Sequence, residues 1–483
     1  MKGLIHMKAP FSNYLNEIAP TIKELVSILS AHYDYVSALS TDSNGIVVAI
    51  SQNSKSVANQ TMATERGTVV RVRKDGLYSE YAFNEINGAT GEELATHIRA
   101  ELDKQLAILK KTKTEVYETG ILADEPLELF VEKETELLPE EADVKELVDM
   151  FTAISDKGVS MSENIIECIA NGQSTHVCKM FISPNRFLRQ SYVYSEGSVV
   201  VVAARDGDNR MAYDGVSGLC GPEVFKDLNE LVETIAKKAV DMLDAERIVP
   251  GEYDVIATPE VSGLIAHEAF GHGVEMDMFV KGRALGAEYI GQRVGSDLVT
   301  MHEGALCEES VAAYAFDDEG VLAGDVTEIE NGILKTGICD ALAALRLGTE
   351  PTGNGKRENF AHKVYTRMTN TVFDSGTDSL DDMIKSIEFG YLLDGMESGM
   401  EDPKHWGIQC ILSRGYEIKD GKLTGKMVSP IVLTGYVPDL LGSISMASTD
   451  RKVPGNGGCG KGHKEWVKVA DGGPYLKCRA RLG

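Results

Sequence analysis

The sequence predicts an α+β protein in two parts, an N-terminal α/β portion with a mixed or antiparallel sheet and a β-rich C-terminal portion. Helical and strand-like patterns alternate over the first half of the chain, and two strand–turn–strand patterns follow in the second half. Short antiparallel connections are typical of α+β folds rather than of doubly wound parallel sheets. A length of 483 residues, 43% of them hydrophobic, allows several domains with full cores and excludes disorder of the whole chain.

The first part of the chain is predicted to form a helix, then strands, then a second helix. Ile18, Ile22 and Leu25 recur at the spacing of one helix face, and β-rich runs follow them. The expected elements are helices over residues 14–31 and 91–109 and strands over residues 35–39, 46–51 and 68–73. The acidic stretch 115–149 contains two prolines and is expected to be a linker that leads into a helix.

A second mixture of strands and helix is predicted before residue 250. The segments 189–194 and 198–204 are expected to form paired strands around Glu196-Gly197. Gly221-Pro222 is a typical helix start, and the apolar spacing after it predicts a long amphipathic helix over residues 224–243.

Pro250-Gly251 is predicted to separate two domains, residues 1–250 and residues 251–483. In the second domain, Asn331-Gly332 and Asp420-Gly421 lie between β-rich runs. Such pairs favour the two-residue turns of β-hairpins, in which both turn residues adopt positive φ. Hairpins are therefore expected in the C-terminal domain.

The charge balance excludes some classes of partner. The chain has 48 Lys and Arg against 74 Asp and Glu, which gives a net charge of −26 and disfavours nucleic-acid binding. No apolar stretch is long enough for a membrane span or a signal peptide, so a cytoplasmic protein is expected. The eight cysteines form no C-x-x-C pair, which excludes a zinc ribbon.

Residues 253–257 read as a strand, and the chain then has the signals of a helix start. Thr258 is expected to cap this helix, and Pro259 fits its first position because a missing N–H is harmless there. The helix carries His267, Glu268 and His272 and should stop near Gly273. Two histidines flanking a glutamate on a helix are typical of a metal site with a general base.

The spacing of the two histidines differs from the usual metallohydrolase motif. Histidines at i and i+4 lie about 40° apart on an ideal helix, whereas His267 and His272 are at i and i+5, about 140° apart. Both can bind one metal only if the helix is locally widened, as in a π-bulge, and Gly271 would tolerate that distortion. The alternative is an ordinary helix with satisfied polar side chains.

A zinc site needs a third protein ligand, and Cys459 is the candidate. It lies in the glycine-rich segment Gly455–Gly462, where backbone N–H groups and Lys461 are expected to favour its thiolate, the form that binds metal. The same segment matches G-x-G-x-x-G, but no helix pattern follows it. A dinucleotide-binding loop is therefore rejected.

Five segments of the C-terminal half, taken together, carry a family resemblance. They are His267–Asp277, Phe316–Gly320, Pro351–Arg357, Arg367–Thr371 and Cys459–Lys461. In sequence and in order they resemble the metal-bearing TldD-like branch of the TldD/PmbA family of metallopeptidases, which also carries the label "modulator of DNA gyrase".

The resemblance implies a zinc ion held by His267, His272 and Cys459, with Glu268 as general base. It further implies a peptidase that hydrolyses unfolded or small polypeptides, present as a homodimer or as a heterodimer with a PmbA-like subunit. We expect the substrate to lie extended along a sheet edge, because such pairing reads backbone rather than sequence. The alternatives are a peptide-binding or assembly subunit whose metal is structural or absent, and a metal-dependent amidohydrolase acting on small amides.

Several further residues are candidates for substrate binding or for support of the metal ligands. Glu275 and Asp277 are expected to orient the metal-bound imidazoles or to form a solvated helix end. Arg367 and Asn370 are expected to bind a peptide backbone or carboxylate, or else to hold a loop together. His463 departs from the family pattern and is expected to be a ligand, an acid or part of a solvated loop.

Overall fold

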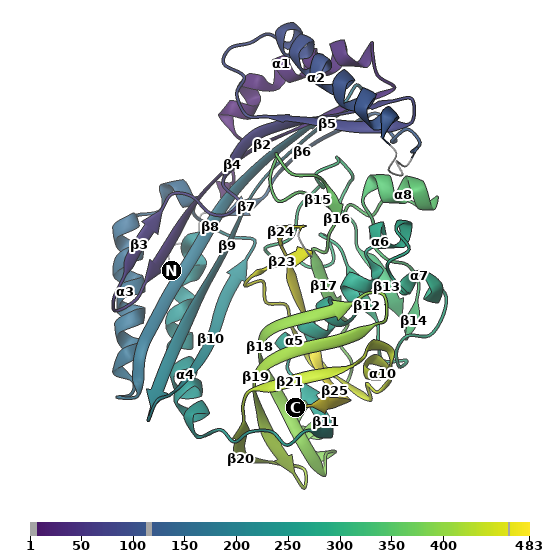
Figure 1. Ribbon diagram of the computed structural model, residues 1–483. Coiled ribbons are helices and arrows are strands. Elements are labelled where there is room, and N and C mark those ends of the chain that lie inside the picture. Colours follow the sequence, from purple (N-terminus) through teal and green to yellow (C-terminus); the bar gives the residue numbers. More distant parts are fainter. Residues whose placement is uncertain (1–6, 113–117, 462–463) are drawn as a thin grey trace.

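The computed structural model describes residues 7–112, 118–461 and 464–483 (Figure 1). It confirms the α+β class: mostly strands, with ten α-helices among these residues. The N-terminal sheet has the strand order β10-β9-β8-β2-β4-β5 and is antiparallel along this path, while β6 is a parallel neighbour of β9. Its strands are β2 (Tyr35–Ile50), β3 (Lys55–Ala58), β4 (Glu65–Lys74), β5 (Leu77–Phe83), β6 (Leu127–Glu132), β8 (Ile165–Ile182), β9 (Arg186–Arg205) and β10 (Asp208–Gly218).

Two pairs of helices cover one face of this long sheet, one pair at each end (Figure 1). The pairs are α1 (Asn13–Ser30) with α2 (Gly91–Lys111), and α3 (Val144–Ser160) with α4 (Leu228–Asp241). On β2, Val36 and Ala38 pack in the first core and Val48 and Ile50 in the second. Because side chains alternate along a strand, Leu39 points to the opposite face and meets the C-terminal part at Phe316.

Three predictions for this part need correction. The segments 35–39 and 46–51 are one strand, β2, because β8 pairs with it from Ala38 to Ile50 without interruption. The segments 189–194 and 198–204 are likewise one strand, β9. Gly197 makes no turn: a Cβ there would lie 2.9 Å from Leu228 Cδ1, so the glycine admits a close helix. The predicted acidic linker leads into a helix, α3, as expected, but it also contains the strands β6 and β7 (Glu134–Thr135).

Part of the C-terminal sheet closes into a ring. The strands follow the order β11-β18-β19-β21-β25, and β25 also pairs with β11. These strands are β11 (Gly251–Ala257), β18 (Phe389–Asp402), β19 (Gly407–Lys419), β21 (Ile431–Tyr436) and β25 (Ala470–Leu482). The sheet continues from β25 through β17 (Asn370–Phe373), β12 (Met301–Glu303), β13 (Val326–Glu330) and β14 (Ile333–Leu334), while β20 (Lys422–Val428) and β22 (Met446–Lys452) pair at its sides.

Short elements complete the C-terminal part. The helices are α5 (Pro259–Leu264), α6 (Asp277–Val280), α7 (Gly286–Tyr289), α8 (Ala341–Leu347), α9 (Leu380–Lys385) and α10 (Val437–Gly442). Two-residue or similarly short strands pair as β1 (Met7–Lys8) with β7 (Glu134–Thr135), β15 (Gly355–Lys356) with β16 (Tyr365–Thr366), and β23 (Gly458–Lys461) with β24 (Lys464–Lys468). Both predicted hairpins are confirmed, with positive φ at Asn331, Gly332, Asp420 and Gly421.

Buried ion pairs join the two parts. Arg71 of β4 pairs with Glu319, Lys179 of β8 pairs with Asp318, and Arg357 pairs with Glu80 of β5. The acidic segment at Asp318 and Glu319 therefore docks the C-terminal part on the N-terminal sheet. The division into independent domains near residue 250 stays a prediction. Among the described residues, no helix is long and apolar enough to cross a membrane.

Candidate metal centre

The helix that carries the two histidines changes its winding along its length. It begins as α5, continues as a π-helix over Ile265–Phe270 and ends as a 3-10 turn over Gly271–Val274. The wider π turn brings residues five apart onto one face, so the imidazole rings of His267 and His272 are only 5.2 Å apart. The widening that the five-residue spacing required is present. Thr258, however, forms no side-chain cap, and its buried hydroxyl has no partner among the described residues.

Cys459 approaches this helix from β23, almost two hundred positions later in the chain. Its Sγ lies 3.3 Å from His272 Nε2, and one ligand atom each of His267, His272 and Cys459 lie within 4.8 Å of one another. Two such atoms on one tetrahedral zinc ion, bound at typical Zn–S and Zn–N lengths, would be roughly 3.6 Å apart. The donor set and its spacing therefore fit a zinc ion.

The electrostatics of the three side chains also suit a metal. Burial alone would raise the pKa of the Cys459 thiol, but the two imidazoles outweigh it and lower that pKa to about 4. Burial alone would lower the pKa of His267, but the adjacent sulfur raises it to about 9. The two imidazoles and the thiolate lie close enough together to share protons. A divalent cation could bind all three groups in place of those protons.

A buried carboxylate orients His272. His272 Nδ1 lies 2.9 Å from Glu275 Oε2, which fixes the tautomer with its lone pair on Nε2, facing Cys459. Lys461 Nζ lies 3.0 Å from the same Glu275 oxygen and 2.6 Å from Asp277 Oδ1. Burial raises the pKa of Glu275, but Lys461 and His272 overcome this and hold it well below its usual range. Lys461 therefore acts on Glu275 and Asp277, not directly on the Cys459 thiolate as the sequence suggested.

Arg367 and Asn370 are buried and hydrogen-bond to groups of the chain itself. Arg367 Nη2 donates to the Cys459 carbonyl at 2.6 Å and so holds β23, the strand that carries Cys459. Asn370 Nδ2 donates to the carbonyls of Gly304 and Glu308. Both side chains are at most 1% exposed, so the loop-holding alternative describes them better than direct substrate binding. His463 lies outside the described residues.

Glu268 faces an open cleft. Its Oε2 lies 4.0 Å from His272 Nε2, and it lines a cleft of about 1290 Å³ together with His267 and Cys459. Gly399 of β18 makes room for it, because a Cβ there would lie 2.4 Å from Glu268 Cγ. The proposed base is thus beside the ligands and accessible to substrate.

One residue of the cleft was not foreseen from the sequence. Asp471 of β25 lines the cleft with Glu268, and burial, opposed by His267, raises its pKa to about 6. It directly precedes Gly472-Gly473, but no residue spacing linked it to the histidine helix. Only the return of β25 beside α5 brings it there.

Comparisons with known proteins identify relatives of this chain. Residues 250–477 match the family described as PmbA/TldA metallopeptidase C-terminal domain. A metalloprotease of Methanocaldococcus jannaschii is 30% identical over 361 residues, which are 70% of this chain and 79% of that protein. A zinc metalloprotease TldD homolog of Saccharolobus solfataricus is 29% identical over 58% of this chain and 62% of its own length. A metalloprotease of Methanothermobacter thermautotrophicus is matched over 66% of its length.

Solved structures share the fold over nearly the whole chain. A putative modulator of DNA gyrase from Thermotoga maritima has a TM-score of 0.74 at 18% identity, covering 95% of this chain and 98% of that one. TldE from Thermococcus kodakarensis has a TM-score of 0.72 at 18% identity, covering 96% and 99%.

Proposed function

The chain belongs to the PmbA/TldD family of metallopeptidases, and we propose that it is a zinc-dependent peptidase acting on unfolded or small polypeptides. The observation that carries the proposal is that His267, His272 and Cys459 converge beside an open cleft, which His267, Cys459 and Glu268 line. A purely structural zinc site would instead have four protein ligands and no open side.

The three ligands would hold the ion through two imidazole nitrogens and one thiolate. When bound, zinc supplies Lewis-acid polarisation of the scissile carbonyl and lowers the pKa of water towards 7 from about 15.7. Glu275 keeps His272 in the tautomer that offers Nε2. Arg367 and Lys461 hold the strand and the carboxylate behind the ligands, so the donor set is preorganised.

Glu268 is the proposed general base. Its carboxylate lies on the cleft side of the ligands, 4.0 Å from His272 Nε2, where it can take a proton from the attacking water. It would then pass that proton to the leaving amine of the cleaved peptide bond.

The substrate is proposed to lie extended beside β18. Among the described strands, β11 pairs with β18 only as far as Leu393, and Met396–Gly399 then line the cleft with one strand edge turned to it. A peptide backbone can pair along such an edge without a sequence requirement. The Met396 carbonyl already accepts a hydrogen bond from Tyr213, so pairing would begin beyond it.

Replacement of Glu268 tests this proposal. The variant Glu268→Gln should retain zinc and lose peptide hydrolysis by at least about a hundredfold, since general-base removal typically has this effect. Peptide cleavage is followed by mass spectrometry and zinc by elemental analysis. A metal-loaded variant that still cleaves at the wild-type rate would refute the assignment.

A further inference from the structure

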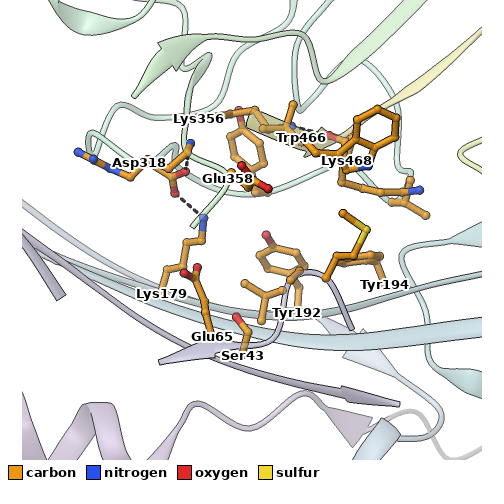
Figure 2. A pocket seen from close by; sticks show the side chains of 18 of the residues that line it. Ser43, Glu65, Lys179, Tyr192, Tyr194, Asp318, Lys356, Glu358, Trp466 and Lys468 are labelled. Atoms are coloured by element: carbon orange, nitrogen blue, oxygen red, sulfur yellow. Dashed lines mark hydrogen bonds and ion pairs between the residues drawn. The ribbon is translucent and has the colours of Figure 1, made fainter. Parts of the chain in front are cut away.

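A second pocket of about 320 Å³ lies between the N-terminal sheet and loops of the C-terminal part (Figure 2). Its floor is formed by residues of β2, β8 and β9, and its roof by segments around residues 311–318, 356–358 and 466–468. Glu358, Gly457 and Trp466 line both this pocket and the metal cleft. Gly457 is two residues from Cys459, which places the shared edge on the order of 7 Å from a metal ligand.

Aromatic side chains form much of the wall. Tyr192 and Tyr194 rise from the sheet, and Trp466 faces them from the other side (Figure 2). Tyr314 also lines the pocket. Gly458 permits the position of Trp466, since a Cβ there would lie 2.4 Å from Trp466 Nε1. Such faces bind apolar chains and also attract organic cations.

The lysines of the pocket are already paired within the chain. Lys179 forms an ion pair with Asp318, and Lys468 Nζ lies 2.6 Å from Glu196 Oε2. Lys356 Nζ donates to the carbonyl of Lys468 at 2.5 Å and to that of Met368 at 3.3 Å. Burial lowers the pKa of Lys356 to about 7. The pocket therefore has little free positive charge to offer an anion.

Three other polar groups of the pocket, a hydroxyl and two carboxyl groups, can all accept hydrogen bonds. Tyr192 is only 9% exposed, yet its hydroxyl has no hydrogen-bond partner among the described residues and points toward Glu358 across the pocket (Figure 2). Glu358 Oε2 lies 3.5 Å from His362 Nδ1. Glu65 accepts one backbone N–H, from Phe360 at 2.7 Å, and burial raises its pKa to about 7. Among the described residues, Glu358 and the Tyr192 hydroxyl therefore face the pocket with no lysine or arginine paired to them. Glu65 already interacts with Lys179 and Arg357.

We propose that this pocket is a subsite for the cationic side chain of a lysine or arginine in a peptide whose backbone lies in the metal cleft. Glu65 and Glu358 receive the charge, Tyr192 accepts a further hydrogen bond, and the aromatic walls cover the aliphatic stem. The net charge of −26 attracts such peptides over a longer range. This inference rests on the proposed peptidase function.

The test measures binding without hydrolysis. Zinc-loaded Glu268→Gln chain is titrated calorimetrically with acetylated, amidated alanine pentapeptides that carry lysine, norleucine or phenylalanine at each position in turn. At one position the lysine peptide should bind about tenfold more tightly than the norleucine peptide, as expected for a desolvated cation between carboxylates and rings. The double variant Glu65→Gln/Glu358→Gln should reduce this ratio to about twofold.

A matched control and the contrary outcomes separate this inference from the proposed function. Glu128→Gln removes an exposed negative charge on β6 that lines neither the second pocket nor the metal cleft, and it should leave the lysine-to-norleucine ratio unchanged. Equal binding of the lysine and norleucine peptides, or stronger binding of the phenylalanine peptide, would overturn the subsite. A wild-type chain that neither binds nor cleaves any of the peptides would overturn the peptidase function as well.

Discussion

Glu275 Oε2 lies 2.9 Å from His272 Nδ1 and 3.0 Å from Lys461 Nζ, so one buried oxygen links a metal-ligand imidazole to a lysine on the strand of Cys459. Through Glu275, the histidine helix is joined to β23 although Glu275 itself is not one of the proposed metal ligands. This link makes the two halves of the donor set interdependent, and this dependence can be measured.

Glu275→Gln should weaken zinc binding by about 10- to 100-fold, because the imidazole loses the anionic partner that raises its basicity. Competition with a chromophoric chelator gives the affinity. The control is Glu288→Gln, an exposed glutamate on α7. Wild-type zinc affinity in Glu275→Gln would mean that this carboxylate only fills space.

Gly399→Ala should leave zinc bound but lower peptide hydrolysis by about a hundredfold or more. The added methyl group would lie 2.4 Å from Glu268 Cγ and 2.9 Å from Leu264 Cδ1, so the proposed base must move. Gly407→Ala on neighbouring β19 is the control, because a Cβ there meets nothing within 4 Å. Activity is measured at saturating zinc, and equal loss in both variants would exclude a local effect on Glu268.

The buried cluster around His176 should make stability depend on pH. Burial alone would lower the pKa of His176, but the Cys178 sulfur and the Glu140 carboxylate, 2.8 Å away, raise it to about 10. Protonated His176 therefore stabilises the folded state. This contribution is complete below about 6.5, the pKa of histidine in the unfolded chain, and is lost as the pH rises through 10.

His176→Gln should therefore be destabilised relative to wild type at pH 6.5, and the difference should shrink towards pH 10. Urea midpoints across this range measure it. The same substitution at exposed His97 is the control. A difference that stays constant with pH would show that His176 contributes by packing alone.

The sequence predicts best those helices and strands that expose one face to solvent, because their apolar residues then recur at a regular spacing. Helices α1 and α2 keep a solvent side, and their apolar spacing predicts them closely. The long strands are different, because residues 35–43 of β2 are buried on both faces and show no alternation. The same burial led to Glu196-Gly197 being taken for a turn, although Gly197 is a packing contact.

Some residues of the candidate site could be predicted from the sequence and others could not. His267, Glu268 and His272 lie on one helix, and their spacing demanded the π turn that the structure contains. Cys459 stood out by its glycine-rich surroundings. Asp471 and the pocket between Tyr192 and Trp466 have no local signal, because the two ends of the chain meet there only through the tertiary fold.

The metal content of wild type beside Cys459→Ser tests the central claim most directly. The account predicts about one zinc per chain in wild type and its loss in Cys459→Ser, whereas Cys220→Ser, a cysteine outside the site, should keep the metal. Zinc retained in Cys459→Ser, or a wild-type chain that cannot be loaded with metal, would contradict the proposed centre and favour a peptide-binding subunit instead.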